Sequence, residues 1–133
     1  MKKKRRILIA DDSKYHRFHL KKLLLENEFD VFEAEDGVDS IQMFRKVMQD
    51  MVITDINMPV MDGIESIEFL KRVDPDVKII VFSSLDEQSM VMKAFRAGAK
   101  DYIVKPLNAK LLMQTVRKHL GKCFAAIEEG FRG

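Results

Sequence analysis

Short apolar runs alternate with longer amphipathic segments along the chain. Five of the runs have the length and the bounding turn signals of buried strands. They cover Arg5 to Ala10, Asp30 to Glu35, Asp50 to Thr54, Val77 to Phe82 and Asp101 to Val104. A segment with apolar residues at helical spacing follows each run, as Leu20, Leu23 and Leu24 do after the first. Five strand–helix repeats with short connections predict a doubly wound α/β domain, a three-layer sandwich with five helices around a five-stranded parallel sheet.

Cap residues mark the ends of the predicted helices. The helical segments cover Lys14 to Asn27, Val38 to Met48, Ile64 to Leu70, Asp86 to Ala97 and Leu111 to Leu120. Ser13 and Asn108 are predicted N-caps, because their side-chain oxygens can accept hydrogen bonds from free backbone N–H groups. Asn27 is predicted to end the first helix in the left-handed conformation, and Gly98 to follow the fourth. The second strand alternates apolar and acidic residues, which favours a position near a sheet edge.

Composition and charge narrow the function classes. The chain has 133 residues, 47% of them hydrophobic and 33% charged, so we expect one globular domain over residues 1–121. A formal net charge of +2 is too small to indicate nucleic-acid binding, and the basic run Lys2 to Arg6 is interpreted as a solvated lead-in to the first strand. No apolar stretch reaches the ~20 residues that span a bilayer, and none resembles a signal peptide. With Cys123 as the single cysteine, these features predict a cytosolic protein without nucleic-acid or membrane partners.

Residues 122–133 form a predicted tail. Phe124, Ile127 and Phe131 lie at helix-like spacing within it. Two interpretations stay open, a helical extension that docks on the domain or on a partner, and a frayed terminus.

Polar side chains follow four of the five predicted strands at the point where each strand ends. They are Asp11 and Asp12 after the first, Asp55 after the third, Ser83 after the fourth and Lys105 after the fifth. The carboxyl ends of parallel strands share one edge of the sheet, which is where such folds bind ligands. Taken alone, Asp55 also fits an ordinary capping residue between strand and loop. The other clusters favour a shared site.

The residue types at this edge indicate phosphoryl chemistry. Three carboxylates in one concave site repel one another unless a cation is present. A set of oxygen ligands, with no His or Cys cluster near it, favours a hard metal ion. Mg²⁺ fits best, because it also binds phosphate oxygens. Lys105 would balance the charge of a phosphoryl group and Ser83 would donate a hydrogen bond to it. Because an aspartate can be the nucleophile in phosphoryl transfer, the residues predict a metal-assisted phosphoaspartate site at Asp55.

These motifs together resemble those of a known family. The sequence carries Asp11-Asp12, the run from Asp55 to Gly63, Ser83-Ser84 and Lys105-Pro106. In type, order and spacing this set is similar to the receiver domain of bacterial two-component response regulators, over residues 5–120. The closest likeness is to the stand-alone, chemotaxis-type receivers. The resemblance implies a flavodoxin-like sheet with strand order 2-1-3-4-5.

The resemblance also assigns roles to the site residues. Asp55 would accept a phosphoryl group from the phosphohistidine of a sensor histidine kinase, from a phosphotransfer protein or from a small donor such as acetyl phosphate. Asp12 and Asp55 would bind Mg²⁺, with Asp11 helping directly or through water and Asn57 contributing its backbone carbonyl. Lys105 would contact the phosphoryl group, and its bond to Pro106 would be cis.

A switch between two conformations is implied as well. The phosphoryl group would draw the Ser83 hydroxyl inward, and Tyr102 would rotate into the vacated space. This would alter the face made by the fourth helix, the fifth strand and the last helix, and so the affinity for an output protein. Tyr102 has a rival interpretation as an ordinary half-buried strand aromatic. Leu85 and Asn57 occupy positions that tune the phosphoryl lifetime in the family.

Several positions depart from the usual pattern or invite another assignment. Ser83 stands where threonine is frequent, and Glu28 stands where many members have glycine after the first helix. His16 and His19, near the start of that helix, are interpreted as solvated or packing residues rather than as a phosphotransfer or metal site.

Other function classes fit the sequence less well. A haloacid-dehalogenase-like phosphatase needs an acid–base Asp two residues after the nucleophile, where this chain has Asn57. A flavin- or dinucleotide-binding protein needs a Gly-rich loop after the first strand, where Asp11-Asp12 stands. A phosphorelay intermediate and a binding-only pseudo-receiver stay as alternatives to a phosphorylation-controlled switch that acts on no outside substrate. The sequence leaves open the kinase, the output partner, and whether the protein is a monomer or a phosphorylation-dependent dimer.

Overall fold

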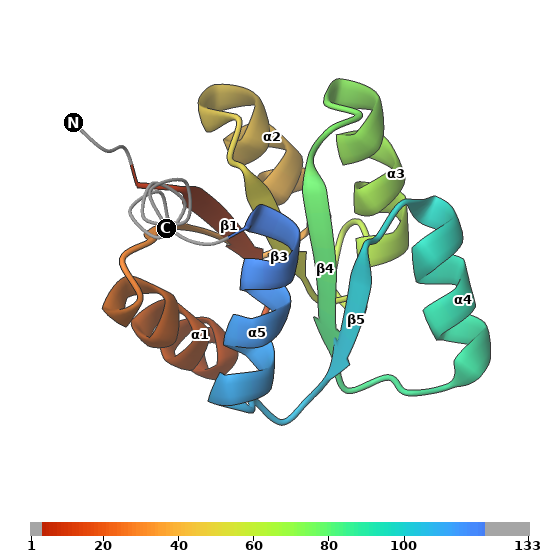
Figure 1. The fold of residues 1–133 in the computed structure, drawn as a ribbon. Coiled ribbons are helices and arrows are strands. Elements are labelled where there is room, and N and C mark those ends of the chain that lie inside the picture. The colour runs from red at the N-terminus through yellow and green to blue at the C-terminus, as the bar shows by residue number, and fades with distance from the viewer. Residues whose placement is uncertain (1–3, 122–133) are drawn as a thin grey trace.

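A computed structural model describes residues 4–121 of the chain (Figure 1). Strands and helices alternate along all of this range. The strands are β1 (Arg6–Ala10), β2 (Asp30–Ala34), β3 (Met51–Thr54), β4 (Lys78–Ser83) and β5 (Asp101–Val104). The helices are α1 (Lys14–Glu26), α2 (Gly37–Val47), α3 (Gly63–Val73), α4 (Gln88–Ala97) and α5 (Ala109–Leu120). The predicted tail, residues 122–133, lies outside the described residues.

The strands form one parallel sheet in the order β2-β1-β3-β4-β5. The predicted flavodoxin-like topology is therefore confirmed, and β2 lies at a sheet edge as its alternating pattern indicated. The strand order reverses between β1 and β3, where the register pairs Ala10 with Thr54. Asp11 and Asp55 follow these two residues directly, so the topology alone brings them side by side.

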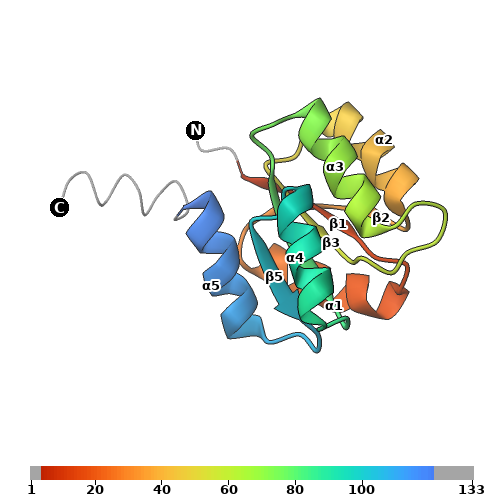
Figure 2. The ribbon, with the colours of Figure 1, turned by 90° about the vertical axis from the view of Figure 1, so that its right-hand side faces the viewer.

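Helices cover both faces of the sheet and bury two separate apolar layers (Figure 2). Helices α2, α3 and α4 pack on one face, with Phe44, Leu70 and Ala94 fully buried. Helices α1 and α5 pack on the other, where Leu24 and Leu112 are fully buried. This two-sided cover explains why the central strands are apolar along their whole length rather than in alternation.

Side-chain caps fix where most helices begin. Ser13, Asp36, Asp62 and Asn108 each accept a hydrogen bond from a backbone N–H in the first turn of the following helix. This confirms the two predicted N-caps. Helix α4 differs, because Glu87 precedes it without a side-chain cap and the helix begins at Gln88 instead of the predicted Asp86.

The end of α1 corrects one expectation. Asn27 has φ −100°, and the left-handed residue is the next one, Glu28, with φ +68°. The N–H of Glu28 donates to the Leu25 carbonyl and the N–H of Phe29 donates to the Leu24 carbonyl, both at 3.1 Å. This paired arrangement is a Schellman motif, in which glycine is the favoured residue at the position of Glu28.

We therefore expect Glu28→Gly to stabilise the protein. Glu28 is exposed, so little packing is lost, and glycine removes the strain of a Cβ in the left-handed region. The gain should be about 1 kcal/mol in the free energy of unfolding, measured by urea denaturation. Glu26→Gly, two residues earlier and inside the helix, should lower stability instead. A lower urea midpoint for Glu28→Gly would contradict the strain argument.

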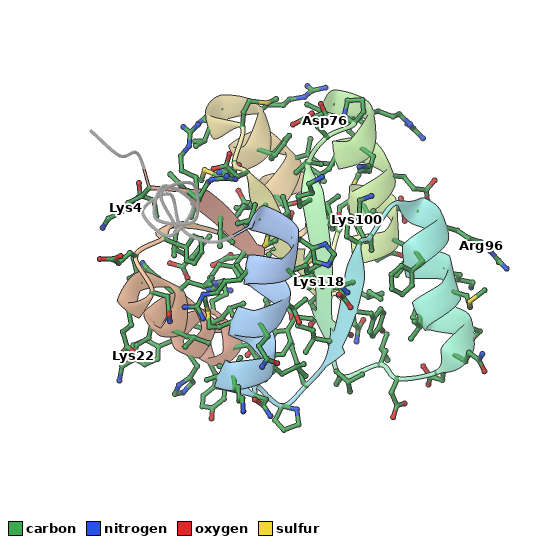
Figure 3. The ribbon with its side chains drawn as sticks, in the orientation of Figure 1. Lys4, Lys22, Asp76, Arg96, Lys100 and Lys118 are labelled. Atoms are coloured by element: carbon green, nitrogen blue, oxygen red, sulfur yellow. The ribbon has the colours of Figure 1, made fainter. Side chains whose placement is uncertain are left out.

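Long charged side chains lie around the outside of the molecule. Lys22 on α1 and Arg96 on α4 are exposed and project away from the sheet (Figure 3).

Within residues 4–121, no helix combines the length and the apolar character needed to cross a membrane.

Candidate functional site

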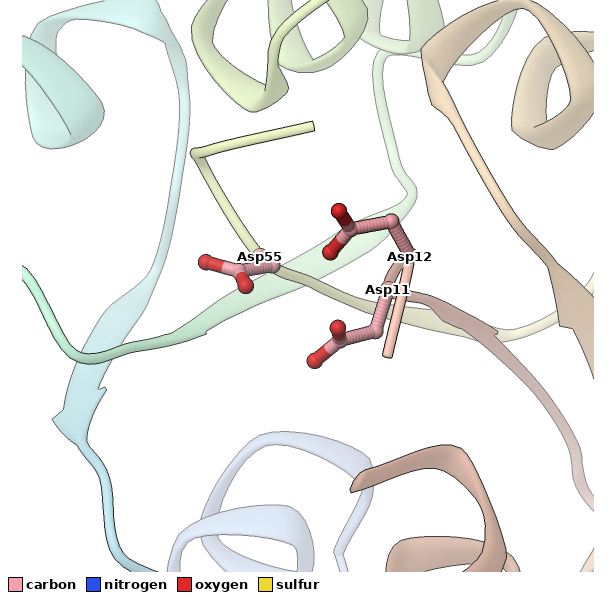
Figure 4. A group of neighbouring side chains, drawn as sticks. All are labelled: Asp11, Asp12 and Asp55. Atoms are coloured by element: carbon pink, nitrogen blue, oxygen red, sulfur yellow. The ribbon is translucent and has the colours of Figure 1, made fainter. Parts of the chain in front are cut away.

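Three carboxylates meet at the carboxyl edge of the sheet. One oxygen from each of Asp11, Asp12 and Asp55 can be chosen so that all three lie within 4.8 Å of one another (Figure 4). Asp11 and Asp55 are buried and Asp12 is exposed. Two strand ends and the loop after β1 therefore supply the acidic cluster that the sequence predicted.

Backbone contacts hold Asp11 in place. Its Oδ1 accepts a hydrogen bond from the Ser13 N–H at 2.8 Å, and its carbonyl accepts one from Arg17 Nη1 at 2.6 Å. Arg17 is itself buried, and its Nε donates to Glu33 Oε1 at 3.2 Å. The guanidinium thus ties the loop after β1 to the edge strand β2. Sequence reasoning did not identify this role of Arg17, because both contacts depend on the tertiary placement of α1.

Asp55 is fixed at both its backbone and its side chain. Its N–H donates to the Ala10 carbonyl at 2.8 Å, which continues the pairing of β3 with β1 by one residue. Its Oδ1 accepts a hydrogen bond from the Ile56 N–H at 2.7 Å, and its Oδ2 accepts one from Lys105 Nζ at 3.0 Å. The carboxylate is held by donors on two sides and has 7% relative exposure.

Lys105 reaches the acidic cluster from the end of β5. Its peptide bond to Pro106 is cis, as expected. Its Nζ donates to Asp11 Oδ2 at 2.8 Å as well as to Asp55, and its side chain is only 8% exposed. Screening by water is weak at such a site, so the ammonium offsets much of the repulsion between the two buried carboxylates.

One contact adds to the interpretation of His16. Its Nδ1 lies 2.9 Å from Lys105 Nζ, so this residue, which packs on Tyr15, also borders the site. His19 does pack as expected, with its ring 4.4 Å from that of Tyr15 and 5.2 Å from that of Phe18.

The remaining predicted residues, Ser83 and Tyr102, meet at one backbone segment. Ser83 is fully buried, and its Oγ accepts a hydrogen bond from the Leu85 N–H at 3.2 Å. The Tyr102 hydroxyl donates to the carbonyl of Leu85 at 2.5 Å. Leu85 is thus held from both sides, by the hydroxyls of the two residues assigned to the switch. The Asn57 carbonyl accepts no loop hydrogen bond among residues 4–121, which leaves it available as a ligand.

Comparison with known proteins agrees with this geometry. Residues 7–117 match the response regulator receiver domain. The chain belongs to that family. Its chemotaxis-type relatives include the chemotaxis protein CheY of Bacillus subtilis, 41% identical over 116 residues that cover 86% of this chain and 97% of that protein. CheY of Thermotoga maritima is 37% identical over 115 residues, 86% of this chain and 96% of that protein.

Solved receivers have the same fold. The CheX–CheY–BeF3–Mg complex from Borrelia burgdorferi contains a chain with a TM-score of 0.85 and 30% identity, over 89% of this chain and 90% of that one. A CheY-like receiver domain protein from Methanospirillum hungatei has a TM-score of 0.86 at 24% identity, over 98% of this chain and the whole of that one, and shares the fold.

The receiver site fits a divalent cation by its own chemistry. The cluster offers carboxylate oxygens only, and among residues 4–121 its three carboxylates are contacted by one ammonium, that of Lys105. Hard ions such as Mg²⁺ select such oxygen sets, and a bound cation would remove the remaining repulsion. The residues present are therefore compatible with Mg²⁺.

Burial raises the pKa of the Tyr102 hydroxyl above its usual value of 10.0, and the charge of Asp55 adds to the shift, while a hydrogen bond with Ser83 opposes it. In the Tyr15→Phe variant, where Tyr102 is the remaining tyrosine, we expect the phenolate absorbance to titrate with a midpoint above pH 10.0. Because the pKa of Tyr102 is higher in the folded than in the unfolded state, its contribution to the free energy of unfolding is fully present below pH 10. That contribution is lost as the pH rises through the pKa of Tyr102 in the folded protein. A midpoint at or below 10 would contradict the buried placement of the ring.

Proposed function

We propose that this protein is a phosphorylation-controlled signalling switch whose acceptor is Asp55. The observation that carries the proposal is the contact of the Asp55 carboxylate with Lys105 Nζ at 3.0 Å, beside two further carboxylates at the same edge. A nucleophile, a cation for phosphoryl oxygens and a metal-binding oxygen set thus converge in one place. The receiver domain is taken as residues 1–121, which the family match over 7–117 supports.

Asp55 carries out the covalent step. One of its oxygens attacks the phosphorus of a phosphohistidine or of acetyl phosphate, and the bond from phosphorus to the leaving imidazole or acetate breaks. An acyl phosphate forms on Asp55, and water later hydrolyses it to aspartate and inorganic phosphate. Lys105 stabilises negative charge on the phosphoryl oxygens, and Ser83 donates a hydrogen bond to one of them.

The metal set consists of Asp11, Asp12, Asp55 and the backbone carbonyl of Asn57. When bound there, Mg²⁺ supplies charge neutralisation for phosphoryl transfer. The protein then assists its own phosphorylation and dephosphorylation, and it acts on no external substrate.

The conformational signal passes through Leu85. A phosphoryl oxygen accepts a hydrogen bond from the Ser83 O–H, and the shift of the hydroxyl toward it lengthens the hydrogen bond that Ser83 Oγ now accepts from the Leu85 N–H. The loop that leads into α4 is then free to shift, and with it the carbonyl that accepts from Tyr102. Phosphorylation thereby biases an equilibrium between two arrangements of α4 and β5.

The face formed by α4, β5 and α5 is suited to a protein partner. Four large apolar side chains on it are exposed, each with a relative accessibility of 42–46%: Met92, Phe95, Val104 and Leu111. Exposed apolar side chains on these three elements are suited to contact another protein. We propose a histidine kinase or phosphotransfer protein upstream and a protein reader of this face downstream. The CheY of the Borrelia structure also occurs in complex with another protein, CheX.

Intact-mass spectrometry tests the proposal directly. Incubation with acetyl phosphate and Mg²⁺ should add one phosphoryl group, and chelation of the metal should prevent it. After the donor is removed, rapid loss of the adduct indicates a fast chemotaxis-like output, whereas slow loss indicates a relay or a sustained switch. A folded protein that gains no adduct would be a binding-only pseudo-receiver, and the proposal would fail.

A further inference from the structure

The ammonium of Lys105 has three acceptors, and one of them is a histidine. Its Nζ lies 2.8 Å from Asp11 Oδ2, 3.0 Å from Asp55 Oδ2 and 2.9 Å from His16 Nδ1. An ammonium has three N–H donors and no lone pair. Lys105 must therefore donate to His16, so Nδ1 is the unprotonated ring nitrogen and Nε2 carries the hydrogen.

The first turn of α1 fixes where this imidazole lies. His16 is the third residue of the helix, and its N–H donates to the capping Ser13 Oγ at 3.3 Å. The N–H of Ser13 in turn donates to Asp11 Oδ1 at 2.8 Å. One turn of backbone thus holds both Asp11 and the histidine. The His16 ring also meets the ring of Tyr15 edge-on, with the centroids 5.6 Å apart.

We propose that His16 is a positioning residue that keeps the Lys105 ammonium aimed at Asp55 throughout the phosphorylation cycle. This inference rests on the proposed function. Asp11 and Asp55 are the two other acceptors of Lys105, and both acquire new partners when a cation and a phosphoryl group enter the site. His16 is the neutral acceptor among the three. It can retain its hydrogen bond to Lys105 while the charge on the two carboxylates changes.

Burial makes this contact matter. The Lys105 side chain is 8% exposed, and its Nζ lies 5.5 Å from the centroid of the Phe82 ring, so water is a poor substitute for a lost acceptor. His16 lies with Asp11, Arg17 and Phe82 around a closely packed space at Asp55 that has no room for a water molecule. Without the imidazole, Asp11 and Asp55 are the acceptors left to the ammonium in the part of the chain that the structure describes, and it would follow Asp11 as readily as Asp55.

A spectroscopic measurement tests the contact without any phosphoryl transfer. In long-range ¹H–¹⁵N spectra at pH 8, where an ordinary imidazole is neutral, His16 should show the Nε2–H tautomer. Lys105→Met should move the Nδ1 signal of His16 and leave that of His19 unchanged. An Nδ1–H tautomer, or an Nδ1 signal that does not respond to Lys105→Met, would overturn the proposal.

Kinetics test the positioning role. His16→Leu removes the acceptor and should slow phosphorylation by acetyl phosphate and Mg²⁺ by about three- to tenfold. His16→Asn should restore most of the rate, because its Oδ1 is an acceptor bonded to the same Cγ position as Nδ1. His19→Leu is the matched control, since it also loses a ring contact with Tyr15 but touches no residue of the site, and its rate should be unchanged.

A double variant shows whether His16 acts through the lysine. In a Lys105→Met background, His16→Leu should slow the reaction by less than about twofold further, because the contact is already absent. If His16→Leu slows phosphorylation as much in the Lys105→Met background as in the wild type, the positioning role is overturned. A His16→Leu protein that is phosphorylated as fast as the wild type would also overturn it. A wild-type protein that takes no phosphoryl group, yet shows the Lys105-dependent Nδ1 signal, would instead remove the proposed function and keep the contact.

Discussion

Asp55→Asn should abolish the Mg²⁺-dependent phosphoryl adduct. The amide is not a nucleophile, so adduct formation should fall by more than roughly 100-fold, to background. The variant also removes one of the three carboxylates at the metal site, and cation binding should weaken. Intact-mass spectrometry over time, with acetyl phosphate in excess, measures the first effect. Calorimetric titration with Mg²⁺ measures the second.

The control must separate loss of the acceptor from loss of structure. In asparagine an NH2 group replaces one of the two carboxylate oxygens, so either the Ile56 N–H or Lys105 Nζ faces a donor where Asp55 now offers an acceptor. Far-UV circular dichroism should therefore accompany each measurement. Asp62→Asn is the matched variant, because Asp62 caps α3 at the end of the same loop and asparagine caps a helix equally well. It should keep the adduct. An adduct that persists in Asp55→Asn would place the acceptor elsewhere.

Much of this site was predictable, because parallel strands deliver their carboxyl ends to one edge. Asp11, Asp55 and Lys105 each follow a strand directly, so strand assignment was enough to bring them together. Errors of one residue at strand ends, as at β4, left this result unchanged. The predicted order of the strands came from the resemblance to receivers, since apolar runs alone do not say which strands are neighbours.

His16 could not be placed in the same way. It contacts a lysine 89 positions later in the chain, across the gap between α1 and the end of β5. Helical spacing gives the face on which a side chain lies, but it does not say which strand end that face meets. The left-handed Glu28 was missed for a related reason, because asparagine in the preceding position carried a stronger local preference than the motif actually used.

Gly63→Ala should destabilise the protein strongly, and for a reason that local preference would get wrong. Gly63 begins α3, where alanine is ordinarily the better helix former by about 1 kcal/mol. In the fold, however, a Cβ on Gly63 would lie 2.1 Å from the carbonyl oxygen of Asp55 and 2.7 Å from Cα of Ile56. Both atoms are backbone, so no side chain can rotate away to make room. The clash outweighs the helix preference.

The expected cost is about 2–3 kcal/mol in the free energy of unfolding, measured by urea denaturation. Glu65→Ala in the same turn of α3 is the control, and it should change the free energy of unfolding by only about a few tenths of a kcal/mol. Relief of the clash must also move the Asp55–Ile56 peptide, because the nearest clashing atom is the Asp55 carbonyl oxygen of that peptide. The next peptide is tied to α3 as well, since the Gly63 N–H donates to the Ile56 carbonyl at 2.8 Å. The Gly63→Ala variant should therefore be phosphorylated more slowly than the wild type, even under conditions in which it is fully folded. Unchanged stability with wild-type phosphorylation would mean that the acceptor loop does not require the close approach of α3 to Asp55.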